Sequence, residues 1–513
     1  MEKTSIWDKP IFHKLFGTTS GKGMQPKEAM AYSIAGFGQN LICTVIGSYL
    51  TIFMTDALGF DLNATIFGTT GVVAVAWLML GTRIFDALND PIMGSIVDKT
   101  RTKWGKCRPY LKWMAIPIAI MTMLCFLPFY PSNDTGFVFA GLIYVIWSVV
   151  YTVADVPYWG LSTAMENNTN IRGNMLTVAR LFCTAGAGLV TILIPIITSA
   201  VTAKYKGEDG LLNPAYAAEN AATLRWTYFI CAVVLVIIAM PMFFYGFKNT
   251  KERFQSEAEA PSFGHNLKLL FKNKELLLIV LSGIFGAARM VYTYTGGLYF
   301  CKYALKNESA YSLLTMLVIP GGLVASVMVP YLTKKFGKKW TFIISHILGG
   351  LAMLIMYFMW NSETGSLSQG GLIVCIVCMV IIGIPQGISN IMTYAMIGDT
   401  VEYLEWKTGE RAEGICFAMQ TFINKIGMAA GAFIGVLAYS MSNISPSNPG
   451  GSMTTEGLNK LWNMLVLSGV ISFILCVIPM FFYTITEKRQ KELVEEIAAR
   501  KAAANPAAES AGE

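Results

Sequence analysis

The sequence predicts an all-α membrane protein, with twelve transmembrane helices arranged in two pseudo-repeats of six. Of its 513 residues, 54% are apolar and only 14% are charged, whereas soluble proteins carry about 25% charged residues. The apolar residues fall in separated runs of about 20, which is the length that crosses a bilayer. A large soluble core would raise the apolar content without producing such runs. Because lipid offers the backbone no hydrogen-bond partners, these runs must be helical.

The apolar runs set the helices that we expect. Their ranges are 29–54, 70–97, 110–130, 136–162, 174–200, 223–247, 276–302, 309–333, 340–360, 370–398, 414–441 and 459–485.

Lysine and arginine set the orientation. They crowd the N-terminal segment, the loop that follows the second helix and the loop around 248–275, while segments 55–69 and 131–135 carry none. By the positive-inside rule, both termini are cytoplasmic. The net charge of +7 is therefore a topology signal and does not indicate nucleic acid. The N-terminus lacks a signal peptide's compact apolar core and cleavage site, so we expect a multi-pass protein of a bacterial cytoplasmic (inner) membrane.

The predicted organisation has five parts. These are a cytoplasmic N-terminus (1–28), an N-terminal bundle (29–247), a central cytoplasmic loop (248–275), a C-terminal bundle (276–485) and a cytoplasmic tail (486–513). Within the central loop, SFGHNLKLLFKNKELL is typical of an amphipathic helix on the inner face. The tail after Lys488 predicts a short helix followed by disorder.

The two bundles echo each other in sequence. GSIVDKTRTKWGKCRP follows the second helix and VPYLTKKFGKKW follows the eighth, so both loops combine glycine with dense positive charge. Every inner loop is basic, so a chance echo is one reading, but the matched position favours common ancestry. Two such halves are the major facilitator arrangement, in which substrate binds near the midplane.

Three charged residues interrupt the second helix in the run RIFDALNDPIMG. Arg83, Asp86 and Asp90 are spaced by three and four residues, which places them on one helix face. Charges within a membrane helix usually mark an ion or substrate path. Two carboxylates one turn apart, about 5–6 Å, repel each other until a proton, a salt bridge or a hard cation intervenes. Asn89 and Thr152 complete an oxygen cage suited to Na⁺, while an Arg83–Asp86 bridge is the structural alternative.

Charged and aromatic side chains on later helices predict a sugar site. Asp155 and Trp159 share a face of the fourth helix, and Arg180 lies on the fifth. A carboxylate and a guanidinium each take two hydroxyls, and an indole packs on a pyranose face. Trp159 as an ordinary core or lipid-facing aromatic is the alternative. Thr421 and Lys425 share a face of the eleventh helix, where Lys425 would neutralise the acids when no cation is bound. For Arg289, structural and functional roles both stay open.

Four motifs resemble one family. DALNDPIMGSIVDKTRTKWGKCRP, ADVPYWGL, DTVEYLEWKTGERAEG and TFINKIG occur in order and are similar to signatures of the glycoside–pentoside–hexuronide:cation symporters, the family of melibiose permease. The resemblance covers nearly the whole chain and implies sugar or glycoside uptake driven by Na⁺, Li⁺ or H⁺. It implies a cation site at Asp86, Asn89, Asp90 and Thr152, and a sugar site at Tyr151, Asp155, Trp159, Arg180, Thr421 and Lys425.

Two helices depart from the pattern of melibiose permease, at three positions. Asn40 stands where an acid holds sugar hydroxyls, with Gln39 in place of a lysine, and Asn390 replaces a sugar-contacting aromatic. Asn40 and Asn390 stay in the expected substrate site, but an α-galactoside is disfavoured. With one fewer acid beside Arg180 and Lys425, an acidic sugar such as a hexuronide becomes a hypothesis.

The expected function is therefore cation-coupled sugar symport by alternating access. Gly94, Asp98, Arg108 and Asp399 are the expected gating residues, and the loop from Lys99 to Arg108 is the expected latch. A monomer suffices and no cofactor is expected besides the coupling cation. The ten scattered cysteines and three histidines indicate neither a metal cluster nor a redox site. The rival functions are a carrier of another cargo such as lysolipid, a non-transporting sugar sensor and, with least support, a membrane enzyme.

Overall fold

The computed structural model describes residues 9–18, 23–166, 168–208, 210–254, 263–293, 295–410 and 413–504. Within these ranges, nine helices are long and apolar enough to cross a membrane. The all-helical membrane fold is thereby confirmed, while the count of twelve spans and the cytoplasmic termini stay predictions. The end of the tail, expected to be disordered, lies outside the described residues.

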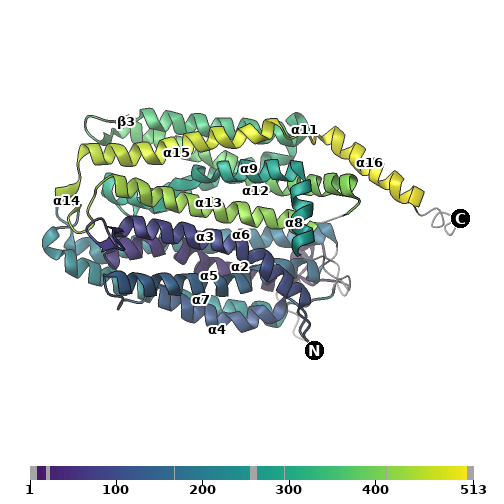
Figure 1. Ribbon diagram of the computed structural model, residues 1–513, viewed down its shortest axis with the longest axis horizontal. Helices are drawn as coiled ribbons and strands as arrows, with labels where there is room; N and C mark the ends of the chain where they lie inside the picture. The colour runs from purple at the N-terminus through teal and green to yellow at the C-terminus, as the bar shows by residue number, and fades with distance from the viewer. Residues whose placement is uncertain are drawn as a thin grey trace. The chain divides into compact units, whose positions relative to one another are not determined.

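The chain is almost entirely helical (Figure 1). The α-helices are α1 (Pro10–Phe16), α2 (Pro26–Ile52), α3 (Gly71–Lys99), α4 (Arg108–Cys125), α5 (Asp134–Met165), α6 (Thr169–Thr202), α7 (Ala217–Asn249), α8 (Phe263–Lys272), α9 (Lys274–Phe285), α10 (Thr295–Tyr299), α11 (Ala310–Phe358), α12 (Gln369–Thr408), α13 (Glu413–Met441), α14 (Pro449–Ser452), α15 (Thr455–Phe481) and α16 (Glu487–Ala504). Two short hairpins pair β1 (Thr65–Ile66) with β2 (Thr69–Thr70) and β3 (Trp360–Asn361) with β4 (Ser366–Leu367).

The seventh and tenth predicted helices differ from the structure. The seventh, expected over 276–302, is broken: α9 ends at Phe285, a 3₁₀ segment covers Ala287–Thr293, and a π-helical turn covers Phe300–Ala304 after α10. The eighth and ninth both lie within α11, separated by a non-helical kink at Gly337, where φ is 77°. The tenth, expected to end at 398, continues to Thr408 as α12.

The chain forms two compact units. Unit 1 comprises Met1–Ala260, Thr293–Leu313 and Gly435–Leu458, and unit 2 comprises Pro261–Tyr292, Leu314–Ile434 and Asn459–Glu513. Unit 1 thus takes two stretches from the second half of the chain.

Glycine allows the helices of unit 1 to pack closely. α2 lies against α6 and α7, and α4 lies against α5 and α7 (Figure 1). A β-carbon on Gly186 of α6 would lie 2.6 Å from the carbonyl oxygen of Phe37, and one on Gly38 of α2 would lie 3.0 Å from that of Ala239. Small residues at such crossings are what brings membrane helices together, since lipid supplies no hydrophobic drive between them.

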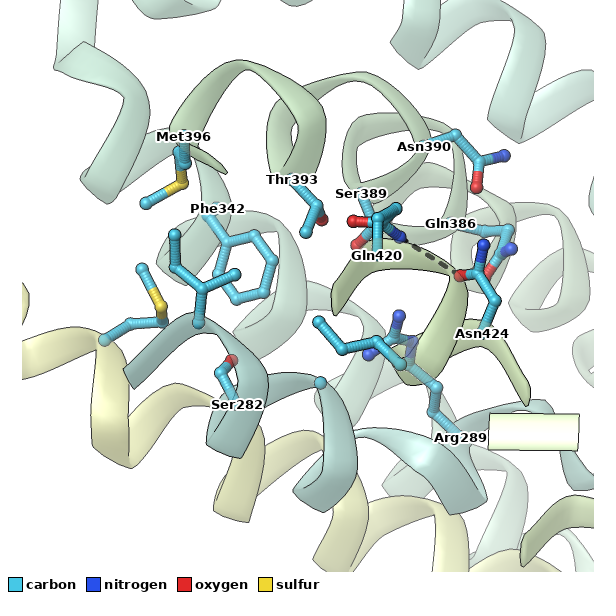
Figure 2. A pocket seen from close by; sticks show the side chains of 14 residues that line it. Ser282, Arg289, Phe342, Gln386, Ser389, Asn390, Thr393, Met396, Gln420 and Asn424 are labelled. Carbon is cyan, nitrogen blue, oxygen red and sulfur yellow. Dashed lines mark hydrogen bonds between the residues drawn. The ribbon is translucent and has the colours of Figure 1, made fainter. Parts of the chain in front are cut away.

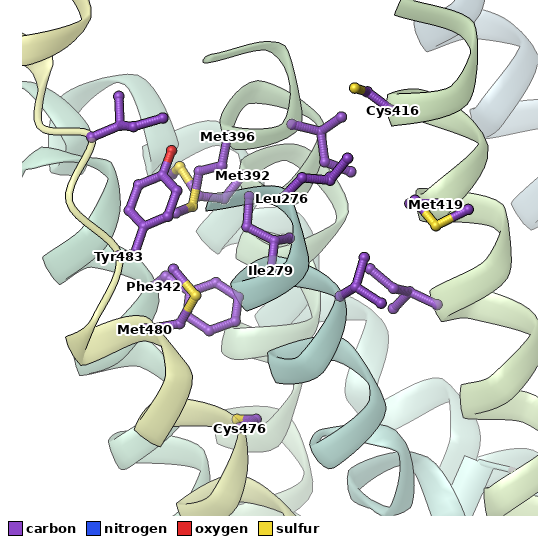
Figure 3. Packing of buried hydrophobic residues seen from close by; sticks show 14 of the residues in the cluster. Leu276, Ile279, Phe342, Met392, Met396, Cys416, Met419, Cys476, Met480 and Tyr483 are labelled. Carbon is purple, nitrogen blue, oxygen red and sulfur yellow. The ribbon is translucent and has the colours of Figure 1, made fainter. Parts of the chain in front are cut away.

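Unit 2 has its own apolar core (Figure 3). Leu276 and Ile279 of α9 pack with Phe342 of α11 and with Met392 and Met396 of α12. The crossing of α11 and α12 is again set by glycine, because Gly383 and Gly387 form a GxxxG pair facing Gly322.

Each unit closes one basic loop in the same way. In unit 1, Gly105 has a φ of 108°, and the Glu252 carboxylate accepts the N–H groups of Lys106 at 2.8 Å and Arg108 at 2.7 Å. In unit 2, Gly337 takes the left-handed turn and Glu487 accepts the N–H of Lys338 at 2.5 Å. The sequence echo between the two loops therefore extends to their hydrogen bonds.

Two predicted surface helices are present. α8 covers most of the segment expected to be amphipathic. α16 follows α15 and packs on α12, where the indole N–H of Trp406 donates to Glu496 at 2.6 Å.

Candidate functional site

One face of α5 carries four polar or aromatic side chains of the candidate site. Asn133 caps the helix by accepting the Gly136 N–H at 3.0 Å. From there the helix runs through Pro157 without a break. Spacings of four, three and four residues align Ser148, Thr152, Asp155 and Trp159 along the face.

Asp155 is the centre of the candidate sugar site. Its Oδ1 atom accepts a hydrogen bond from the amide of Gln39 on α2 and another from the indole N–H of Trp159 at 3.2 Å. The guanidinium of Arg180 on α6 lies over the Trp159 ring, 5.0 Å from its centroid. The structure thus brings Arg180 of α6 to the pair Asp155 and Trp159 of α5, residues that the sequence placed on two different helices.

Asp86 lies in a second polar cluster, at the contact of α3 with α5. Its carboxylate accepts a hydrogen bond from Ser148 and lies 3.6 Å from a guanidinium nitrogen of Arg83. The Arg83–Asp86 pair, weighed as the structural alternative, is therefore formed. The Thr152 hydroxyl is buried and has no hydrogen-bond partner among the described residues. Asn89 and Asp90 follow on α3, both partly exposed.

Oxygen atoms dominate this cluster. The carboxylates, the Asn89 carbonyl and the Thr152 hydroxyl are the ligand types that hard cations prefer. The buried hydroxyl of Thr152 is an acceptor without a partner, which is what a cation ligand requires. Among the described residues, no group of three or more His, Cys, Asp or Glu side chains could hold a metal ion.

The other predicted substrate residues have structural neighbours of their own. Tyr151 stacks on Trp147, with ring centroids 4.9 Å apart. The Asn40 amide donates to the Gly36 carbonyl at 3.1 Å within its own helix. Asn390, Thr421 and Lys425 belong to unit 2, where Asn390 lines a pocket on α12 and Lys425 is buried on α13.

The predicted gating residues lie near helix ends. Gly94 lies within α3, which continues to Lys99. The side chain of Asp98 lies outside the described part of the chain. Arg108 begins α4 and donates to the Phe247 carbonyl at 2.7 Å. Burial lowers the pKa of Arg108, an effect that the neighbouring Glu252 opposes.

Asp399 was expected in a loop or gate, and the longer α12 makes it helical. It is buried and pairs with the Lys338 ammonium at 2.6 Å. The ion pair explains why the helix passes the predicted end, because the first charge of the polar run is neutralised rather than exposed.

A cluster that the sequence reasoning missed joins the π-helical turn Phe53–Ala57, which follows α2, to the stretch 295–304 within unit 1. The buried Asp56 accepts hydrogen bonds from the ammonium of Lys302, from the Tyr303 hydroxyl at 2.9 Å and from the Thr55 hydroxyl at 2.7 Å. Tyr299 stacks on Tyr439 with centroids 4.2 Å apart. Lys302 is a lone charge in the apolar run GGLYFCKYAL, so the sequence alone could have indicated this polar cluster.

Unit 2 contains a pocket with an empty volume of about 520 Å³, part of which is open to solvent (Figure 2). Arg289, Gln386, Asn390, Gln420 and Asn424 supply its cationic and amide lining, and Ser282, Ser389 and Thr393 add hydroxyls.

An all-helical membrane fold with polar residues buried on its helices is typical of multi-pass membrane transport proteins. The chain belongs to the family described as MFS/sugar transport protein, which it matches over residues 31–487. The resemblance to the glycoside–pentoside–hexuronide:cation symporters is thereby confirmed.

Two curated relatives illustrate the family. An isoprimeverose transporter of Lactiplantibacillus pentosus is 28% identical over 481 residues, covering 92% of each chain. A glucuronide carrier protein homolog of Escherichia coli is 27% identical over 474 residues, covering 92% of this chain and 95% of the relative.

A solved structure shows the same fold. The crystal structure of a D-xylose–proton symporter superposes with a TM-score of 0.57 at 13% identity, covering 88% of this chain and 96% of the other. The homologues and structural neighbours are transporters, and this chain is a transport protein rather than an enzyme.

Proposed function

We propose that the protein is a symporter of the bacterial cytoplasmic membrane that couples uptake of a glycoside to Na⁺ or H⁺ by alternating access. One observation carries the proposal: Asp155 is buried at 7% exposure and shares one cluster with an indole and a guanidinium. Relatives named as an isoprimeverose transporter, a glucuronide carrier protein homolog and a putative sulfoquinovose importer agree with it.

The sugar is held mainly by side-chain hydrogen bonds and stacking. Asp155 accepts two hydroxyls, and it exchanges the Gln39 amide for one of them. Trp159 supplies the ring face, and Arg180 donates to a further hydroxyl. Tyr151, Asn40, Asn390, Thr421 and Lys425 remain proposed substrate residues.

The cation is held by oxygen atoms of Asp90, Asn89 and Thr152, with Asp86 shared between the cation and Arg83. This sharing explains why a bridge and a cation site coexist on one helix face. Cation and sugar each tighten the binding of the other by the same coupling free energy, typically about 1–3 kcal/mol.

The proposed gates lie near the inner loops. Gly94 and Asp98 at the end of α3 and Arg108 at the start of α4 form one gate. Asp399, paired with Lys338, belongs to the second. In the proposed cycle, these residues make loop contacts that hold the inner side closed in one state, and these contacts break in the other state.

The test is glycoside binding and uptake by purified protein, in detergent by calorimetry and in proteoliposomes by tracer flux, with and without Na⁺ and over a range of pH. Asp155→Asn should abolish binding of glycosides, and Asp90→Cys should abolish the stimulation by cation. Glu363→Gln, on an exposed turn between β3 and β4, is the matched control and should change neither. Uptake by Asp90→Cys that is still fully stimulated by cation contradicts the cation site. Glycoside binding without flux favours the sensor.

A further inference from the structure

The pocket of unit 2 has a chemistry distinct from the cluster around Asp155. Its side chains offer one guanidinium, four amides and three hydroxyls, and the lining within the described residues includes no carboxylate. In Figure 2, Arg289 reaches into the pocket toward the amides of Gln420 and Asn424. By contrast, Arg180 lies on the indole that donates to Asp155.

Local structure presents Arg289 to this pocket. The residue lies in the 3₁₀ segment between α9 and α10, where the seventh predicted helix is broken. Its N–H donates to the Ser472 hydroxyl at 3.2 Å, and that hydroxyl donates to the Phe285 carbonyl at 2.7 Å. Ser472 of α15 therefore satisfies both backbone groups that the break leaves open. Broken helices in transporters commonly line the substrate cavity.

A glycine makes room for the guanidinium. A β-carbon at Gly286 would lie only 2.1 Å from Nη1 of Arg289. The guanidinium therefore lies folded over the helix break, and any larger residue at 286 displaces it without changing the charge.

The amides suit the hydroxyls of a sugar. Gln420 is buried at 5% exposure, and its Nε2 donates to Asn424 at 3.1 Å. Its Oε1 is buried and accepts no hydrogen bond from the described residues, so it is available to a hydroxyl donor. A guanidinium presents a planar fork of donors that matches the two oxygens of a carboxylate or sulfonate.

We infer that this pocket is an anion-selective subsite, in which Arg289 binds the carboxylate or sulfonate of an acidic sugar while Gln420 and Asn424 bind its hydroxyls. The inference rests on the proposed function, since it deepens sugar transport to a substrate class. It assigns the anion to Arg289 rather than to Arg180 and Lys425, and it gives the break in the seventh helix a role in specificity.

The test compares sugars that differ only at C6. Calorimetry on the full-length protein would use methyl β-D-glucuronide, methyl β-D-glucoside and the methyl glycoside of 6-deoxy-6-sulfoglucose. We expect the wild type to bind an anionic sugar roughly 10- to 100-fold more tightly than the neutral one, the range that a charged hydrogen-bond pair supplies. Comparing the affinities of the carboxylate and sulfonate sugars shows which anion fits the pocket better.

Variants locate the preference. Arg289→Gln should reduce the ratio of acidic to neutral affinity to within about threefold by weakening the acidic sugars, and Gly286→Ala should reduce that ratio with the arginine still present. Arg489→Gln on α16, outside the pocket, is the control and should keep the wild-type ratio. Arg180→Gln should weaken acidic and neutral sugars alike.

The outcomes separate the two proposals. If the wild type binds neutral and acidic glycosides equally, the anion subsite is wrong and sugar transport stands. Equal loss of both ligands in Arg289→Gln also contradicts it, because that residue would then serve the fold or every sugar. Binding of none of the three ligands overturns the proposed function and the subsite with it. Should Arg289→Gln fail to fold, Gly286→Ala and the wild-type ratio decide the matter.

Discussion

Lys302 is the side chain whose removal has the clearest expected consequence. Its ammonium pairs with Asp56, whose side chain is only 2% exposed. The pair joins the π-helical turn Phe53–Ala57, which follows α2, to a stretch from the second half of the chain within unit 1. Lys302→Met keeps most of the aliphatic stem and removes the charge. Asp56 would then keep only the hydroxyls of Thr55 and Tyr303 as partners.

The magnitude follows from burial. Breaking a buried ion pair by removing one partner costs about 3–5 kcal/mol, because the remaining charge is uncompensated. Two hydroxyl donors remain on Asp56, so we expect the lower end, about 3 kcal/mol. That corresponds to roughly a hundredfold rise in the population in which this stretch has left unit 1. Asp56→Asn should raise the open population less, since Lys302 is 22% exposed and its flexible stem can carry the charge toward water.

Cys301 reports the opening directly, because it is fully buried beside Lys302. In a variant that keeps only this cysteine, the rate of maleimide labelling in detergent should rise about a hundredfold on Lys302→Met. The combined Asp56→Asn, Lys302→Met variant should label more slowly than Lys302→Met alone. Lys204→Met, at an exposed residue of the same unit, is the control. Equal labelling rates in the wild type and all variants would refute the assignment of a stabilising role to this pair.

Three further substitutions test separate parts of the structure. Thr152→Val should leave the melting temperature unchanged or slightly raised, since the Thr152 hydroxyl has no partner among the described residues. The same variant should weaken cation-stimulated sugar binding at least tenfold. A matching loss of stability would show that the hydroxyl has a structural role. Glu252→Gln and Glu487→Gln should each destabilise the loop that the carboxylate closes by about 1–2 kcal/mol. Limited proteolysis within that loop should become faster, and proteolysis at the wild-type rate would show that the carboxylate does not hold the loop closed. Gly321→Ala should lower the melting temperature by the equivalent of about 1–3 kcal/mol, because its β-carbon would lie 1.8 Å from the Val380 carbonyl, and an unchanged value would show that the crossing can widen freely.

Local patterns predicted the parts of this protein that depend on local physics. The apolar run and charge spacing of 70–97 anticipated α3, and the spacing of Thr152, Asp155 and Trp159 anticipated one polar face of α5. Extending that spacing one turn back would have found Ser148, the donor to Asp86. These features follow from helix geometry, which residue spacing alone determines.

Partners that lie far apart in the sequence were beyond this reasoning. Gln39 meets Asp155 across 116 positions, and the Arg289 N–H meets Ser472 across 183. The Ser472 hydroxyl also donates to the Phe285 carbonyl, so hydrogen bonds on both sides of the break in the seventh helix involve a residue far along the chain. The continuation of α12 likewise depends on Lys338 neutralising Asp399.

The matched turns at Gly105 and Gly337 also have a consequence for biosynthesis. Each loop receives its carboxylate late: Glu252 lies 146 positions after Lys106, and Glu487 lies 149 after Lys338. At a synthesis rate of about 5–20 residues per second, each loop waits roughly 7–30 s for its partner. Glu252 is translated before any of α8 to α16, so the first loop can close while these helices are still being made. The second loop cannot close until Glu487, at the start of α16, has been translated.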